Sequence, residues 1–500
     1  MKLTEISKYD ARPGVLTEWR LDQVTIAAAA ASPQDRRPPS YLQDAHVRTA
    51  ATLRQIGVEA PTWLATAFDF QGALDVRAMK ATLLQWITRH ETLRSGLRLE
   101  GEELNRFTLS PEAVSLEPVV IDAFTSGAAM VRYLEDRFDV AADPLTWPPY
   151  LFATVEHENA FTIYLAFDHS NVDGYSIAQI AHEVHELYDA ARADRPAELP
   201  EAGSYVDFSQ LEHEAAADLD VDHDSVLRWR DFVEACGGEL PRFPLDLGIA
   251  PGEFPRQTGG YEWLIDAADA KAFDAVCKAA GGNFATGVVA ITSAIAHELS
   301  GDPVYRTVMP LHTRSEPRWA ASLGWYIGLA PLEIPTAQAA DFHDLVRMSR
   351  EATRAVKPMA QVPFARVGSL LDDPVRPLSV ISYIDTRVVP GAGQWDEWNA
   401  HAFGKVSYGD EVYMWINRNH EGAYVTCRYP TTDVAHRNVN EYIERVRAAL
   451  VEVARTGTYA FGRAVEDAAP HEAVGSPDHV GETPGFELLG EPLAQVGGGA

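Results

Sequence analysis

The sequence His169-Ser170-Asn171-Val172-Asp173-Gly174 lies between two segments of different periodicity. Residues 161–167, before it, are all apolar, aromatic or β-branched, which predicts a buried strand. Residues 175–188, after it, carry apolar side chains at helical spacing, which predicts a helix. His169 is therefore expected where a core strand ends and a helix begins. A turn between two rigid elements can hold a side chain toward a cavity.

The residue types in this stretch suggest one chemistry. The imidazole of His169 is well suited to take up a proton near neutral pH, and Asp173 can hold the turn that carries it. The interpretation is a base that activates a nucleophile, positioned by a buried carboxylate. The alternative is a structural histidine at a strand end, since a His-x-x-x-Asp-Gly pattern also arises by chance in a chain with 16 histidines.

Length and composition limit the class of protein. Because 500 residues exceed what one compact core usually contains, two domains or two large subdomains are expected. A hydrophobic fraction of 46% with 10% aromatic residues is typical of a well-packed globular enzyme. A formal net charge of −30 argues against broad binding of nucleic acid, because phosphate backbones would be repelled.

The sequence shows no sign of export or of a membrane span. Its first residues lack the apolar core of a signal peptide, and it has no run of about 18 apolar residues. Cys236, Cys277 and Cys427 are scattered, so they form neither a disulfide framework nor a metal cluster. We therefore expect a cytoplasmic protein without an integral membrane segment and without a metal site.

Predicted strands and helices continue on both sides of a boundary region. Residues 193–225 contain a Pro-containing loop and a run of acidic residues, which indicates the boundary. Residues 464–500 contain no Lys or Arg and many Gly, Pro, Asp and Glu residues, which predicts disorder. The predicted division is an N-terminal subdomain over 1–200, a linker over 201–225, a C-terminal subdomain over 226–463 and a disordered acidic tail over 464–500.

Several segments together resemble the chloramphenicol-acetyltransferase-like superfamily, which includes condensation domains and polyketide-associated acyltransferases. His169-x-x-x-Asp173-Gly174 is similar to the end of its His-His-x-x-x-Asp-Gly motif. The segments occur in the expected order over about residues 35 to 455, which a chance motif would not do. The other matching segments are Arg89-His90-Glu91-Thr92-Leu93-Arg94, Tyr205-Val206-Asp207-Phe208 and Gly324-Trp325-Tyr326-Ile327-Gly328 and, for the polyketide-associated branch of actinobacteria, Pro39-Ser40-Tyr41, 380–385 and 413–418.

This resemblance implies a fold. The fold class is α/β (α+β), with two chloramphenicol-acetyltransferase-like subdomains, each a mostly antiparallel sheet flanked by helices. The subdomains are expected to meet in a V with a tunnel between them. His169 would lie midway along this tunnel, so that donor and acceptor enter from opposite faces.

The activity implied by the resemblance is that of an acyltransferase in lipid or polyketide natural-product biosynthesis. It would move an acyl group from acyl-CoA, or from an acyl carrier protein of a polyketide synthase, to a hydroxyl-bearing small molecule or lipid. The donor is a substrate, so no permanently bound cofactor is expected. His169 is the predicted general base, and Asp173 is expected to pair with Arg314 of the second subdomain. Gly174 is expected to allow a backbone geometry or close approach that a Cβ would obstruct.

One residue departs from the family pattern. Asp168 stands where the full motif has its first histidine, and a carboxylate there would raise the pKa of His169 if it pointed inward. Two other functions stay open, namely a condensation enzyme that forms an amide with an amine acceptor and a noncatalytic member that binds a carrier protein. An anionic donor would need a local basic patch, for which the candidates are Arg89, Arg94, Arg98, Arg306, Arg314 and Arg318.

Overall fold

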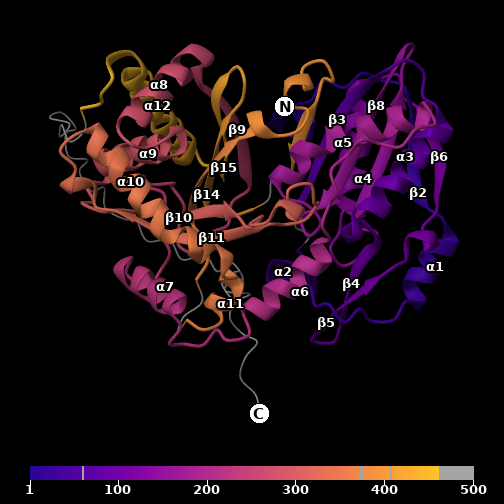
Figure 1. The fold of residues 1–500 in the computed structure, drawn as a ribbon, viewed down its shortest axis with the longest axis horizontal. Helices are drawn as coiled ribbons and strands as arrows, with labels where there is room; N and C mark the ends of the chain where they lie inside the picture. The colour runs from indigo at the N-terminus through magenta and orange to yellow at the C-terminus, as the bar shows by residue number, and fades with distance from the viewer. Residues whose placement is uncertain (59–60, 372–374, 406–407, 461–500) are drawn as a thin grey trace, which may run out of the picture.

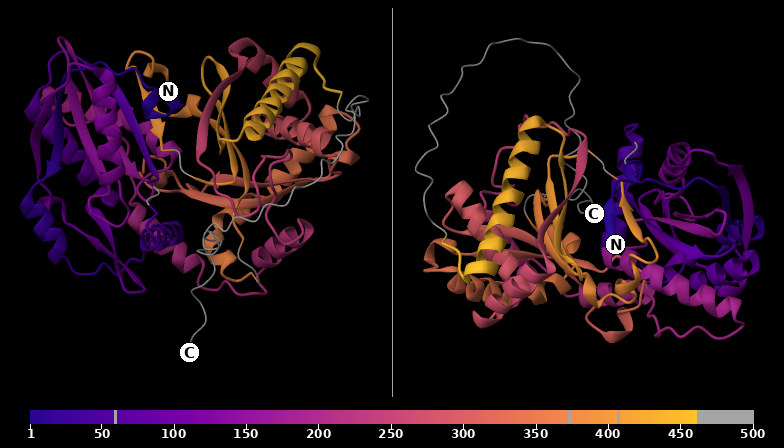
Figure 2. Two further views of the ribbon diagram at one scale, coloured as in Figure 1. Left: turned by 180° about the vertical axis from the view of Figure 1, so that it is seen from behind. Right: turned by 90° about the horizontal axis from the view of Figure 1, so that it is seen from above.

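In the computed structural model the chain forms two halves, each built on its own β-sheet (Figure 1 and Figure 2). The structure describes residues 1–58, 61–371, 375–405 and 408–460, so the predicted acidic tail lies outside the described residues. The described helices are α1 (Gln23–Ala31), α2 (Tyr41–Gln55), α3 (Val76–Arg89), α4 (Gly127–Ala141), α5 (Gly174–Arg192), α6 (Tyr205–Ala215), α7 (Asp224–Ala235), α8 (Ala267–Ala279), α9 (Phe284–Ser300), α10 (Phe342–Val356), α11 (Phe364–Gly368) and α12 (Asp433–Thr456).

The first sheet has helices on both faces. Its strands, in spatial order, are β1 (Lys2–Thr4), β13 (His401–Gly404), β3 (Trp63–Gln71), β8 (Ala160–Asp168), β7 (Tyr150–Glu156), β2 (Val15–Leu21) and β6 (Leu116–Ala123). Neighbouring strands run antiparallel except β1 and β13. Helices α3 and α5 pack on one face and α4 on the other, so every residue of the central strand β8 is buried. This double coverage explains why 161–167 is a continuous apolar run rather than an alternating one.

The second sheet is mixed. Its strands, in spatial order, are β11 (Ile327–Ile334), β10 (Tyr305–His312), β12 (Ser379–Asp385), β14 (Val412–Arg418), β15 (Gly422–Pro430) and β9 (Gln257–Asp266). It shares one core with α8, α9, α10 and α12. A separate hairpin pairs β4 (Ser95–Glu100) with β5 (Glu103–Thr108). β10, β12 and β14 are parallel, so their carboxyl ends lie at one edge of the sheet. Arg314 follows β10 at this edge.

Two segments lie differently from the predicted division. All of 226–463 was assigned to the second half, but β13 inserts between β1 and β3 of the first sheet. Trp395 and Ala400, just before it, belong to the core of the first half. Within the predicted linker, 205–215 forms α6, in which Tyr205 and Val206 are buried. The local sequence pattern of these short segments does not indicate which half of the protein they pack on.

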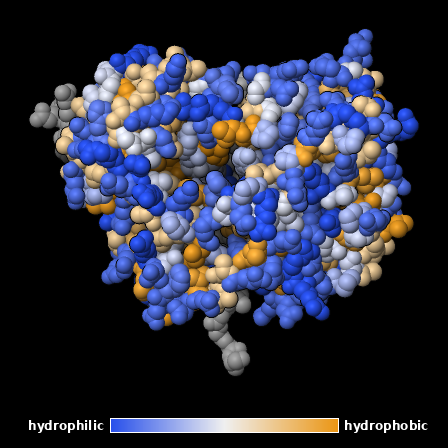
Figure 3. All heavy atoms as spheres, viewed as in Figure 1, coloured by the Kyte–Doolittle hydropathy of each residue, from blue (hydrophilic) through white to orange (hydrophobic). Residues whose placement is uncertain are grey.

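The elements that determine the site agree with the sequence pattern. The predicted strand 161–167 lies within β8, and the predicted helix over 175–188 lies within α5. Within the described ranges, no single helix is long and apolar enough to cross a membrane; α8 and α9, which meet at 90°, reach that length and composition only when taken together. On the face shown in Figure 3 the surface is hollowed where the two halves meet. A tunnel through the molecule stays a prediction.

Candidate active site

The turn that carries His169 is held first by its own helix. β8 ends at Asp168, and α5 begins at Gly174 with Asp173 as its N-cap residue. The Oδ1 atom of Asp173 accepts a hydrogen bond from the amide of Ser176 at 2.7 Å, which satisfies one of the free amides in the first turn. The carboxylate predicted to position His169 therefore also starts the helix.

Asp173 also joins the two halves. Arg314 donates from Nη1 to Oδ2 at 2.6 Å and from Nη2 to Oδ1 at 3.0 Å, which is a two-bond fork. The side chains of Asp173 and Arg314 are 1% and 6% exposed. Burial disfavours the charged carboxylate, but Arg314 and the hydrogen bonds from Ser176 outweigh it and hold the pKa of Asp173 below its usual value. Asp173 is therefore a charged, buried contact between the halves.

The ring of His169 faces a residue of the second half. Its centroid lies 4.0 Å from that of Trp325, with the rings tilted by 31°. His169 is half-buried; its Nδ1 is fully buried, and its Nε2 forms no hydrogen bond with the described residues. Burial and the charge of His46 lower the pKa of His169 below its usual value. The ring is therefore neutral near pH 7, and Nε2 is the nitrogen left to meet a substrate.

The backbone of Trp325 is held by a side chain of α6. The hydroxyl of Tyr205 donates to the carbonyl of Trp325 at 3.0 Å and shares a hydrogen bond with Oγ of Ser40 at 2.9 Å. A Cβ at Gly324 would collide with the ring of Tyr205, so this close approach requires glycine. Three segments that the sequence pattern singled out, at Ser40, Tyr205 and Gly324, thus act together to place Trp325 beside His169.

Asp168 has a partner that the sequence did not indicate. The Nε2 atom of His46, on α2, lies 2.9 Å from Oδ2 and 3.1 Å from Oδ1 of Asp168. The Asp168 side chain is 0% exposed and that of His46 is 12% exposed. Burial disfavours the charged form of both groups, but the contact between them outweighs it. The pKa of His46 is therefore raised and that of Asp168 is lowered.

Asp168 was expected to raise the pKa of His169 if it pointed inward, and its charge does act in that direction. The net shift is nevertheless downward. Burial of the ring and the positive charge of His46 outweigh the carboxylate of Asp168. No local pattern marks His46 as part of the site, because it lies 122 residues before Asp168 in the chain.

The match to known families agrees with this geometry. Residues 62–378 match the Condensation domain family. The chain belongs to this family. Among known proteins, it is 28% identical over 470 residues to 2'-acyl-2-O-sulfo-trehalose (hydroxy)phthioceranyltransferase PapA1 of Mycobacterium tuberculosis, covering 92% of this chain and 90% of the relative. It is 29% identical over 473 residues to trehalose-2-sulfate acyltransferase PapA2 of Mycobacterium bovis, covering 92% and 98%.

Solved structures give the same result. A PapA2 acyl transferase superposes with a TM-score of 0.85 at 27% identity, covering 91% of this chain and 100% of that one. The first condensation domain of the calcium-dependent antibiotic synthetase superposes with a TM-score of 0.63 at 16% identity, covering 87% and 99%, which shows a shared fold alone. The predicted family, the fold of two chloramphenicol-acetyltransferase-like halves and the prediction that the chain is an acyltransferase are confirmed.

In this condensation-domain protein the segment Arg89-His90-Glu91 has structural contacts and, in the described part of the chain, forms no hydrogen bond with His169. Nε2 of His90 lies 2.7 Å from Oε2 of Glu183, and Nε of Arg89 donates to Oε1 of the same carboxylate at 3.1 Å. Glu91 accepts two hydrogen bonds from Arg37. The segment therefore ties the end of α3 to α5, the helix that follows the His169 turn.

The expectation that backbone geometry requires glycine at position 174 is wrong. The φ angle of Gly174 is not in the left-handed region, and a Cβ there would meet no described protein atom within 4 Å. Gly174 is exposed at the start of α5. A close approach of a substrate to this residue stays a prediction.

The six arginines proposed as basic patches do not form a free patch. Five of them lie in ion pairs and the sixth donates to backbone carbonyls. The pairs are Arg89 with Glu183, Arg94 with Glu91, Arg306 with Glu333, Arg314 with Asp173 and Arg318 with Glu316, and Arg98 donates to Ala29 and Ser32.

The described residues contain no group of three or more His, Cys, Asp or Glu side chains placed to hold a metal ion. The thiols of Cys236, Cys277 and Cys427 are free. What the arrangement offers chemically is one neutral, partly accessible imidazole beside an aromatic ring, held between two buried carboxylates.

Proposed function

We propose that this condensation-domain enzyme transfers an acyl group from a thioester to a hydroxyl group of a sugar-containing acceptor, with His169 as the general base. The observation that carries the proposal is the placement of the His169 ring beside Trp325: it is half-buried, with Nδ1 buried and with Nε2 forming no hydrogen bond with the described residues. Burial lowers its pKa, which favours the neutral form. The relatives named for trehalose-sulfate substrates support a sugar hydroxyl as acceptor and an ester as product.

In the proposed reaction, Nε2 of His169 takes the proton of the acceptor hydroxyl while its oxygen attacks the thioester carbonyl. A carbon–oxygen bond forms, and the carbonyl oxygen becomes an oxyanion. The tetrahedral intermediate then collapses, the carbon–sulfur bond breaks, and the departing thiolate takes the proton from the His169 imidazolium. The ring ends neutral, so no acyl-enzyme and no resident cofactor are needed. The donor, acyl-CoA or an acyl carrier protein, is consumed as a substrate.

The start of α5 is suited to the charge that develops. The N-terminus of a helix carries a partial positive charge and free amides, and the amide of Gly174 is the first of α5. We assign this amide to the oxyanion. Asp173 and Arg314 position the turn and do not contact the reacting atoms in this scheme.

The test compares the wild-type protein with His169→Ala and with His312→Ala, which removes an exposed histidine at the end of β10. Each is incubated with a panel of acyl-CoA and acyl carrier protein donors and with trehalose, trehalose-2-sulfate or an amino sugar, and products are identified by mass spectrometry. We expect an ester from the wild type and from His312→Ala. His169→Ala should lose about 10²- to 10⁴-fold in turnover, with circular dichroism and melting unchanged.

The alternatives have distinct outcomes. Near-normal turnover by a folded His169→Ala protein contradicts the role of the base. An amide formed only with the amino sugar favours the condensation reaction with an amine. Binding of an acyl carrier protein without loss of its acyl chain, for every acceptor, favours a noncatalytic protein.

A further inference from the structure

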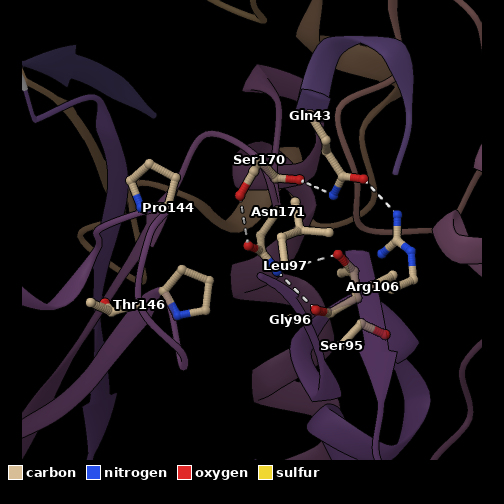
Figure 4. A pocket seen from close by; sticks show the side chains of 11 residues that line it. Gln43, Ser95, Gly96, Leu97, Arg106, Pro144, Thr146, Ser170 and Asn171 are labelled. Carbon is tan, nitrogen blue, oxygen red and sulfur yellow. Dashed lines mark hydrogen bonds between the residues drawn. The ribbon is translucent and has the colours of Figure 1, made fainter. Parts of the chain in front are cut away.

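Helix α2 contacts both residues that flank His169. His46 pairs with Asp168 on one side, and Nε2 of Gln43 donates to the carbonyl of Ser170 at 2.9 Å on the other. Gln43 and His46 are three residues apart, so they lie on one face of the helix. Figure 4 shows Gln43 between Ser170 and Arg106, whose Nη2 donates to Oε1 of Gln43 at 2.7 Å. Helix α2 thus contacts the turn at the residue before His169 and at the residue after it.

The helix itself is fixed at its start. Ser40 and Gln43 form a capping box at the N-terminus of α2, and the Ser40 hydroxyl contacts Tyr205. Tyr205 is the residue that holds Trp325, whose ring centroid lies 5.5 Å from that of His46. The His46 ring is therefore placed beside the same tryptophan as His169.

The charges that face His46 favour its protonated form. Asp168 touches the ring, and the more distant Asp143 acts in the same direction, although Asp143 itself pairs with Arg54. Thr62, whose hydroxyl also reaches Asp168, carries no charge. The pKa of His46 is therefore raised, whereas that of His169 is lowered, so His46 stays protonated at a pH at which His169 is neutral.

The charges that face His169 oppose each other. His46 disfavours the imidazolium form, and Asp168 and Asp173 favour it. The charge of Asp173 is matched by Arg314. Among these charges His46 has the largest effect on the pKa of His169, larger than the opposing effect of Asp168 or of Asp173.

We propose that His46 is a positioning residue for the transfer: through Asp168 it holds the turn that carries His169, and it sets the charge that the base meets on that side. This inference rests on the proposed function. A second buried pair serves as a control. The side chains of His90 and Glu183 are 1% and 4% exposed, and neither residue is among the groups that shift the pKa of His169.

The experiment titrates protein labelled with ¹³C at Cε1 of histidine and follows each imidazole by NMR. The variants are His46→Gln, which removes the charge, His46→Lys, which keeps it, and His90→Gln as control; His169→Ala assigns the resonance of the base. In the wild type we expect His46 to titrate above, and His169 below, the ordinary value of about 6.5. His46→Gln should raise the midpoint of His169 by about 0.5 to 1 unit. His46→Lys and His90→Gln should leave it near the wild-type value.

An unchanged His169 midpoint in folded His46→Gln overturns the inference. So does a wild-type protein in which His46 titrates below His169, with the two resonances assigned from the variants. The acid limb of kcat/KM separates this inference from the proposed function. If the NMR midpoint of His169 moves in His46→Gln and the acid limb does not, then His169 is not the base, while the effect of His46 on His169 stands.

Discussion

The two carboxylates that flank His169 are both buried, yet their charges are matched in different ways. Asp173 is held by Arg314 of the second half through two hydrogen bonds from a guanidinium, a group that proteins in general keep charged. Asp168 is held by His46 of the same half, whose imidazole loses its charge as pH rises through its raised pKa. The contact between Asp173 and Arg314 can therefore join the halves at both neutral and alkaline pH. The contact between Asp168 and His46 weakens as His46 loses its proton, so it makes the position and the charge of His169 depend on pH.

The largest expected effect comes from breaking the contact between the halves. Asp173→Asn leaves the guanidinium of Arg314 buried without a counter-charge, and Arg314→Met leaves the carboxylate in the same position. Each should lower the free energy of unfolding by about 3–5 kcal/mol, measured by urea denaturation. The double variant Asp173→Asn/Arg314→Met should lose less than the sum, because it leaves no unmatched buried charge.

This loss should be the same at pH 6 and pH 9. The pKa of Asp173 is lowered in the folded protein, so its contribution to stability is present above its unfolded pKa and is lost only as pH falls through the folded value. Unchanged unfolding of either single variant, together with unchanged turnover, argues against a role for the ion pair.

The pair of His46 and Asp168 should instead show a pH-dependent effect on stability. The pKa of His46 is raised by folding, so its contribution is fully present below the unfolded value of about 6.5 and is lost as pH rises through the folded value. His46→Gln should therefore cost about 1–3 kcal/mol near pH 6 and progressively less toward pH 9. Urea denaturation across this range measures it. A difference from wild type that stays constant from pH 6 to pH 9 contradicts the pairing.

The same contacts set the expected pH profile of the enzyme. Because the pKa of His169 is lowered, the neutral base is present through neutral pH and is lost as pH falls through that lowered value. The acid limb of kcat/KM should have its midpoint below about 6.5, the value of a free histidine. Steady-state rates from pH 5 to pH 8 test this, and a midpoint above that of a free histidine shows that the lowered pKa of His169 does not control the reaction.

The smallest effect on stability is expected at Gly174, which follows Asp173 in the chain but takes no part in its hydrogen bonds with Ser176 and Arg314. A Cβ there meets no described protein atom, so Gly174→Ala should change the free energy of unfolding by no more than about 1 kcal/mol. Turnover is the sharper measurement. If the acceptor or oxyanion approaches this residue, kcat/KM falls while melting is unchanged; if both stay at wild-type values, a close approach at Gly174 is wrong.

The parts of the site that could be predicted from the sequence are those encoded locally or by a matching segment. The apolar run of β8 and the helical spacing of α5 place His169 at their junction, and Asp173 is the kind of residue that starts a helix. Arg314 was expected because its segment resembles that of a known family. His46 was missed, since α2 reads as an ordinary amphipathic helix, and so was the crossing of β13 into the first sheet.

The sequence by itself determined the strand, the turn, the helix and the imidazole between them, because periodicity and capping depend on residues that are neighbours in the chain. Only the tertiary structure decided which charges meet. His46 lies 122 residues from Asp168, and Arg314 lies 141 residues from Asp173. The pKa of His169 depends on burial and on these distant charges, so it is a property of the packed protein rather than of the motif.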